Sequence, residues 1–338
     1  MSAEPSTSAT RPRQHVRQHA SRGGERGRER LAYWGYRAAE RALSALPRRV
    51  VMPGAVALSN GAYDLSGPKG AVVRANMAQA LGLPADDPRV SRAARRAFQN
   101  FGRYLAEVMR LPALDPVEAR RRVTFHGWEQ LAAAQGSEGK GLLICAVHVG
   151  AMDLLAPAIM VEGEKVSVVG DDTTYGRLYD HLAAIRAAFG VQVIGWRNLR
   201  RLYKVLQGGG NLVLLCDGAY RPGDVPVELL GAATTFPAGP AVISARTGAA
   251  ILPIGARRTA DDGLEAWGYP VIRAASSEPA EVYRTTQALA DALGQVIAGD
   301  PGQWYMFRPV WPQTDADRAA AEAALARARA GEDWTIGR

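Results

Sequence analysis

The chain has 338 residues, of which 47% are hydrophobic and 22% charged, and its net charge is +8. This composition is ordinary for a folded protein and excludes a chain that is disordered throughout. The length suits one large α/β domain or two smaller ones.

The positive charge is concentrated at the N-terminus. Residues 1–30 carry seven arginines against three glutamates, a net +4 that is half of the total. They are rich in Ser, Gly and Gln, so we predict a disordered tail over 1–30. Its charge suits an anionic membrane surface or nucleic acid, and having no partner is a third alternative.

The N-terminal tail and the two cysteines indicate where the protein is located. No apolar segment follows the basic residues, so no secretory signal is expected. Cys145 and Cys216 have neither CxxC nor histidine spacing. This pattern argues against a structural zinc site and favours a reducing compartment, which we expect to be the cytoplasm.

The first third of the chain is predicted to be helical. Leu31, Trp34 and Ala38 recur at helical spacing within a helix over 31–46 that carries arginines at its end. Such a helix lies in a membrane interface or packs on the domain. Residues 53–68 are rich in glycine and small residues, and no element is predicted there. Helices are predicted over 74–81 and 89–109.

From residue 122 onward, strand and helix patterns alternate. Strands are predicted over 123–125, 142–147, 166–169, 191–194, 212–216 and 251–254, and helices over 128–134, 152–160, 178–189, 199–206, 241–246, 281–298 and 315–330. This repetition predicts an α/β fold, with a mostly parallel central sheet flanked by helices and a helical N-terminal region. We expect a single domain over 31–312, with a mainly helical part over 31–115 and an α/β core over 122–312. A C-terminal helix and tail follow over 313–338.

The stretch 142–153 carries the clearest chemical signal. An apolar strand ends at His148, and Gly150 and Asp153 follow where a helix begins. A neutral imidazole can act as a general base, and a carboxylate can orient it. We therefore predict that the backbone turns at Gly150 and that Asp153 pairs with His148. The alternatives are two ordinary polar groups, or a membrane span over 141–161, which Gly150 and two central ionisable groups disfavour.

Polar residues also follow the strand over 212–216. Asp217 stands at a strand end, as His148 does, so both are expected to face one cleft. Arg221 suits a phosphate or carboxylate ligand, or belongs to a polar turn. Glu228 is expected either to contribute charge near the His148–Asp153 pair or to form an ion pair with an arginine.

Several familiar catalytic motifs are absent. The chain has no GxSxG, GxxxxGK[ST], HExxH or strand-following GxGxxG motif. A metal hydrolase built on His148, Asp171, Asp172 and Asp217 would lack recognised ligand spacing.

Three motifs in order give the chain a family resemblance. They are the H-x4-D pattern of His148 and Asp153, the run Phe236–Pro240 with Thr247–Pro253, and the aromatic run from Pro301 to Trp311. Across residues 31–312 the chain resembles the glycerolipid acyltransferase superfamily. Within it, the chain is similar to bacterial lipid A late acyltransferases and to phosphatidylinositol mannoside acyltransferases.

The resemblance implies transfer of a fatty acyl group from a thioester to a lipid hydroxyl. His148 would take the hydroxyl proton, Asp153 would orient His148, and Glu228 would assist. The implied substrate-binding residues are Asp217, Arg221 and Arg308.

The resemblance also implies the partners. The co-substrate would be acyl-CoA or an acyl carrier protein thioester, with no bound cofactor, and a phosphatidylinositol mannoside-like acceptor is favoured. The enzyme would be peripheral on the cytoplasmic face of the cell membrane, on an anionic surface, with no nucleic acid partner. The alternatives are a non-catalytic lipid-binding membrane protein and a thioester hydrolase.

Overall fold

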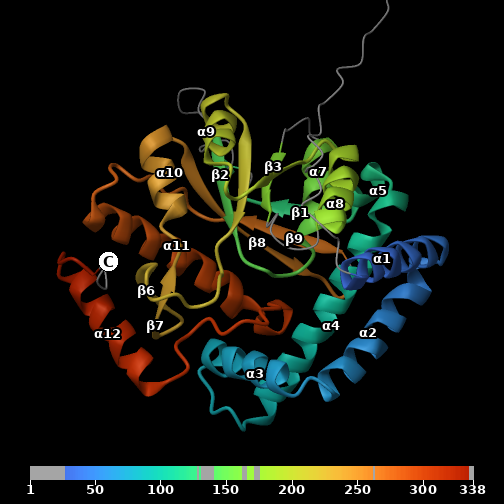
Figure 1. The fold of residues 1–338 in the computed structure, drawn as a ribbon, viewed down its shortest axis with the longest axis horizontal. Helices are drawn as coiled ribbons and strands as arrows, with labels where there is room; N and C mark the ends of the chain where they lie inside the picture. Colours follow the sequence, from blue (N-terminus) through green and yellow to red (C-terminus); the bar gives the residue numbers. More distant parts are fainter. Residues whose placement is uncertain are drawn as a thin grey trace, which may run out of the picture.

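The protein has an α/β fold built on a mostly parallel sheet, as predicted (Figure 1). The computed structural model describes residues 27–127, 129–130, 141–161, 166–170, 176–261 and 263–334. Within these ranges seven strands form the main sheet, in the order β1-β9-β8-β2-β5-β3-β4. All neighbouring strands are parallel except β8 and β9.

The strands are short and mostly buried. They are β1 Val123–His126, β2 Leu142–Ala146, β3 Val166–Gly170, β4 Gln192–Gly195, β5 Asn211–Leu215, β6 Val225–Leu229, β7 Ala232–Phe236, β8 Ala250–Arg258 and β9 Leu264–Gly268. The β6–β7 hairpin and β9 were not predicted. The hairpin turns at Leu230 and Gly231, which both have positive φ, whereas the sequence signal for such a turn is Asn-Gly or Asp-Gly.

The helices surround the sheet. They are α1 Gly27–Ala45, α2 Arg48–Asp64, α3 Pro68–Leu81, α4 Pro88–Arg110, α5 Pro116–Arg121, α7 Met152–Val161, α8 Gly176–Ala188, α9 Leu199–Gln207, α10 Gly239–Thr247, α11 Pro279–Gly299 and α12 Asp315–Arg329. Two 3₁₀ turns, η1 Leu111–Ala113 and η2 Pro301–Gln303, follow α4 and α11. Most of the helix predicted over 128–134 lies outside the described residues.

Helix α2 occupies much of the glycine-rich stretch for which no element was predicted. Its residues Val51 and Met52 are buried against Ala106 of α4. A Cβ on Gly102 of α4 would lie 2.0 Å from the Ser59 hydroxyl, so the small residues allow the two helices to approach closely. Packing of α2 on α4 therefore overrides weak local propensity.

Helices cover both faces of the sheet. On one face, α9, α10 and α11 pack through residues such as Leu206, Ile243 and Leu293. On the other face, α7 and α8 pack through Leu154 and Ile185. Strand β2 is buried along its whole length, which explains its unbroken apolar run.

The described helices include none that is long and apolar enough to cross a membrane. The apolar stretch 141–161 instead forms β2, a turn and α7.

The sheet brings two polar positions together at its carboxyl edge. Strands β2 and β5 are adjacent and parallel, with Ala146 paired to Leu215. His148 and Asp217 each follow two residues later, so the two side chains emerge beside each other.

Candidate active site

His148 is held by Asp217 at the carboxyl edge of the sheet. The Nδ1 atom of His148 lies 2.8 Å from Oδ1 of Asp217, and the backbone N–H of His148 donates to Oδ2 at 2.8 Å. The Asp217 side chain is fully buried, whereas 42% of the His148 side chain is exposed. One end of the imidazole is therefore fixed and the other faces outward.

This arrangement sets the protonation of the ring. A carboxylate only accepts hydrogen bonds, so Nδ1 carries the proton and Nε2 presents its lone pair. Nε2 has no hydrogen-bond partner within the described ranges of the chain. Burial lowers the pKa of His148, but the charge and hydrogen bond of Asp217 outweigh it, and the pKa is raised above its ordinary value. The ring is thus a basic group aimed at the surface.

A third donor holds Asp217 from the C-terminal part of the chain. The indole Nε1–H of Trp304 donates to Oδ2 of Asp217 at 2.8 Å, and Trp304 is completely buried. The backbone N–H of Tyr305 donates to the carbonyl of His148 at 3.0 Å. The aromatic motif at 301–311 therefore lies directly beside His148.

Glycine is required at the turn after His148. Gly150 has φ +63°, and a Cβ there would lie 2.7 Å from the carbonyl oxygen of Ala256. The backbone turn predicted at Gly150 is present.

Asp153 does not pair with His148, which corrects the geometry predicted for the dyad. Arg186 on α8 binds its carboxylate with two hydrogen bonds, of 2.7 and 3.1 Å, and the Tyr104 hydroxyl donates to it at 2.6 Å. Burial raises the pKa of Asp153, but Arg186 and Tyr104 outweigh it and the pKa is lowered. Asp153 is a firmly ionised group with its own partners.

Tyr305 contacts both polar clusters. Its ring is stacked on Tyr104, with centroids 5.3 Å apart, and it meets the His148 ring edge-on at 6.3 Å. Tyr305 therefore links His148 to Tyr104, whose hydroxyl donates to Asp153.

Glu228 pairs with an arginine, which was the second predicted alternative, and does not assist His148 as the resemblance implied. It lies on β6, its side chain is 45% exposed, and its carboxylate pairs with Arg329 of α12 at 2.6 Å. The described contacts of Glu228 do not include His148 or Asp217. The carboxylate beside the histidine is Asp217, which was expected to face the same cleft as His148 but was assigned a substrate-binding role.

Arg221 and Arg308 are both exposed and lie on connected segments. The backbone N–H of Tyr220 donates to the carbonyl of Pro309 at 2.9 Å, which joins the two segments. Arg308 is near enough to His148 for its charge to lower the pKa of the imidazole. Both guanidinium groups are therefore available at the sheet edge.

Sequence reasoning missed Tyr104 and Arg186, and it gave Trp304 no individual role. Tyr104 lies within α4 and Arg186 within α8, and neither residue belongs to a local motif. Only the aromatic run around Trp304 signalled its position.

Helix α1 presents its apolar residues to the outside. Leu31 and Trp34 are 75% and 56% exposed, while the buried Glu40 accepts from His181 of α8 at 3.0 Å. The buried Glu40 and the partly buried Leu43 thus face the protein, whereas Leu31 and Trp34 are exposed.

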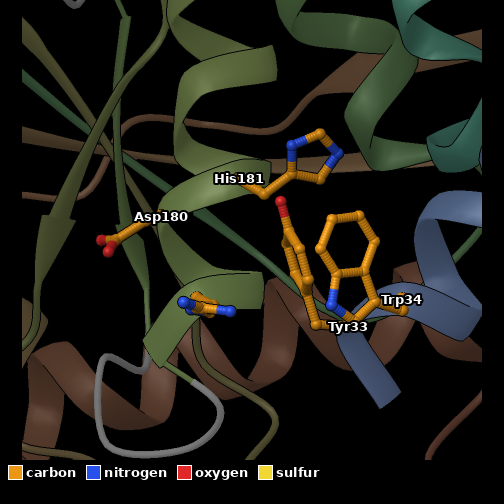
Figure 2. A pocket seen from close by; sticks show the side chains of 5 residues that line it. Tyr33, Trp34, Asp180 and His181 are labelled. Carbon is orange, nitrogen blue, oxygen red and sulfur yellow. The ribbon is translucent and has the colours of Figure 1, made fainter. Parts of the chain in front are cut away.

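A cavity of about 480 Å³ lies between α1 and α8. It is lined by Tyr33, Trp34, Arg177, Asp180 and His181. In Figure 2, Tyr33 and Trp34 extend from α1 beside His181, while Asp180 points to the other side.

The described residues contain no group of three or more His, Cys, Asp or Glu side chains placed to hold a metal ion. Asp171 and Asp172, considered above as metal ligands, lie outside these residues.

Comparison with known proteins gives consistent matches. The family described as "Bacterial lipid A biosynthesis acyltransferase" matches residues 26–313. A phosphatidylinositol mannoside acyltransferase of Mycobacterium tuberculosis (strain ATCC 25618 / H37Rv) is 28% identical over 291 residues, covering 82% of this chain and 88% of the relative. The protein of the same name from Mycolicibacterium smegmatis (strain ATCC 700084 / mc(2)155) is 28% identical over 287 residues, covering 82% and 90%.

Proposed function

Because the chain belongs to the bacterial lipid A biosynthesis acyltransferase family, we propose that it transfers a fatty acyl group from a thioester to a hydroxyl of a glycolipid, with His148 as general base. The observation that carries this proposal is the pairing of His148 with buried Asp217, which leaves Nε2 basic and facing outward. The similarity to phosphatidylinositol mannoside acyltransferases favours an acceptor of that type.

The proposed reaction needs no covalent intermediate on the enzyme. Nε2 of His148 removes the proton of the acceptor hydroxyl while the oxygen of that hydroxyl attacks the thioester carbonyl. The carbon–sulfur bond breaks, the thiolate leaves, and the imidazolium returns the proton to sulfur. Asp217 stabilises the imidazolium that forms between these steps.

The charged groups at the site fit an anionic substrate. Arg308 and Arg221 are exposed on linked segments beside His148. We assign them to phosphates of the lipid or of the acyl donor, which is acyl-CoA or an acyl carrier protein thioester. Asp153 acts through Tyr104 and Arg186 as a positioning residue.

We propose a peripheral location on the cytoplasmic face of the membrane, and the outward apolar face of α1 supports the membrane contact. A helix that packs through Glu40 and exposes Leu31 and Trp34 is arranged to place its apolar side in a lipid interface. This favours the interfacial alternative for the helix predicted over 31–46.

The test is acyl transfer by His148→Ala with a radiolabelled acyl-CoA and a phosphatidylinositol mannoside acceptor. We expect transfer to fall by about 10²- to 10⁴-fold, since this is the usual contribution of a general base. His126→Ala, on the surface strand β1, is the matched control and should retain activity.

Three results would contradict the mechanism. Unchanged transfer by His148→Ala would show that the imidazole is not the base. Release of free fatty acid by the unchanged protein, with no acylated lipid, would indicate a thioester hydrolase. Binding of lipid without any turnover would indicate a lipid-binding protein.

A further inference from the structure

A second exposed surface combines apolar and cationic side chains at the carboxyl edge of the sheet. It is formed where β4 ends and α9 begins, and we call it the β4–α9 surface. Its residues, all exposed, are Trp196, Arg197, Leu199, Arg200, Arg201 and Lys204. Trp196 is 49% exposed and Leu199 57% exposed, so the surface presents two large apolar side chains beside its cations.

The charge of this surface is of one sign. Residues 196–204 hold four cations and no carboxylate. Within the described chain, none of these four side chains forms an ion pair. The Arg197 guanidinium lies 5.0 Å from the centre of the Trp196 ring, so the cation and the aromatic side chain point outward together.

The surface lies at the same edge of the sheet as His148. Strands β5 and β3 separate β2 from β4, which corresponds to roughly 14 Å at the usual strand spacing. Leu215, the last residue of β5, is 41% exposed within this interval. Leu215 therefore places one exposed apolar side chain between the end of β4 and His148.

We propose that the β4–α9 surface contacts an anionic lipid bilayer beside the active site, in addition to the contact made by α1. Trp196 and Leu199 enter the interface, and the four cations bind lipid phosphates. The acceptor hydroxyl then reaches His148 from the bilayer without the lipid leaving it. This last step rests on the proposed function, whereas the contact itself does not.

The apolar residues favour a bilayer over the phosphates of the acyl donor. A phosphate group would use the arginines but would leave Leu199 and Leu215 exposed to water. A bilayer interface accommodates both classes of side chain, because it presents anionic headgroups above hydrocarbon.

The experiment is sedimentation of the full chain with vesicles at low salt. One set of vesicles is phosphatidylcholine, and the other is phosphatidylcholine and phosphatidylglycerol in equal parts. Arg200→Glu with Arg201→Glu should weaken partitioning to the anionic vesicles by about 25-fold, fivefold for each cation removed. Trp196→Ser with Leu199→Ser should weaken partitioning to both sets, by roughly tenfold.

Lys69→Glu with Arg92→Glu is the matched control. It makes the same change in net charge on exposed positions of α3 and α4, at the end of the molecule away from α9 (Figure 1). This variant should sediment like the unchanged protein. An equal loss in the control would attribute binding to net charge and overturn the proposal.

Acyl transfer to an acceptor dispersed in detergent separates this proposal from the proposed function. The Arg200→Glu, Arg201→Glu variant should retain transfer in detergent and lose it with the acceptor in anionic vesicles. Unchanged sedimentation with a raised KM for acyl-CoA in detergent would place the donor's phosphates on this surface and overturn the bilayer contact. If the unchanged protein transfers no acyl group in detergent, the proposed function fails, while sedimentation still tests the surface.

Discussion

At the scale of single residues, the geometry of the site depends on which carboxylate forms a hydrogen bond with His148. Asp153 is five residues away in the sequence and Asp217 is 69 residues away, yet Asp217 makes the contact. Parallel strands β2 and β5 end side by side, whereas the helix that follows the turn carries Asp153 towards Arg186. Strand adjacency therefore outweighs proximity along the chain.

Replacing Asp217 by Asn should remove both the charge and the fixed tautomer of His148. An amide can donate to Nδ1, which would turn the protonated nitrogen outward, so we expect kcat/KM to fall by roughly 10²- to 10⁴-fold. Asp217 raises the pKa of His148, and the base must be unprotonated to act. The acidic limb of the pH profile should therefore move to lower pH in Asp217→Asn. A limb that stays in place would exclude His148 as the titrating base.

Trp304→Phe should shift the same limb in the opposite direction. Loss of the indole donor leaves the Asp217 carboxylate less stabilised, so it attracts the imidazolium proton more strongly and the pKa of His148 rises. A hydrogen bond to a charged group contributes about 1.5–3 kcal/mol, so activity should fall roughly tenfold to 100-fold. Rate measurements across pH check both effects. A fall in rate without a shift would indicate a purely structural role for Trp304.

At the scale of elements, Asp153 joins three helices. It lies on α7, Arg186 on α8 and Tyr104 on α4, and α8 in turn holds α1 through His181 and Glu40. The helices around the site are thus connected by hydrogen bonds that converge on one carboxylate.

Asp153→Asn should destabilise the protein because it leaves the largely buried Arg186 without its counter-charge. We expect the free energy of unfolding to fall by about 3 kcal/mol, measured in urea near neutral pH. The folded state lowers the pKa of Asp153, so its contribution is present above the ordinary carboxyl pKa and is lost as the pH falls. The difference between the two proteins should therefore shrink below about pH 4.

Asp64→Asn is the matched control for Asp153→Asn. Asp64 pairs with Arg95 on an exposed surface, where such a pair contributes at most about 1 kcal/mol. A similar loss for both variants would show that burial of the Asp153–Arg186 pair has no special effect.

The sequence predicted the elements whose local pattern agrees with their packing. It did not predict the elements that depend on contacts with distant parts of the chain. β2, α4 and α11 have strong periodicity or continuous apolar runs, and their local pattern agrees with their packing. α2 depends on close contact with α4, which no local pattern reports. The pairing of His148 with Asp217 required strand order, and the motif alone favoured Asp153.

At the scale of the whole molecule, buried ion pairs connect two of the N-terminal helices to the sheet. Glu107 of α4 is buried between Arg258 of β8, with which it forms an ion pair, and Arg48 of α2 at 2.8 Å. Burial raises the pKa of Glu107, but these arginines outweigh it and the pKa is lowered. Helices α2 and α4 are therefore fixed to the sheet that carries His148.

Leu31→Ser should consequently weaken membrane binding without affecting the fold. Leu31 is 75% exposed, so its loss removes no core packing, whereas its insertion into a lipid interface would bury most of that surface. We expect partitioning to phosphatidylcholine vesicles to fall roughly tenfold, with a smaller change on anionic vesicles, where the arginines also contribute. Val117→Ser, at a 48% exposed position on α5, is the matched control and should bind as the unchanged protein does. If both variants sediment equally well, the outward apolar face of α1 does not contact the bilayer, and the polar packing of α1 on α8 needs another explanation.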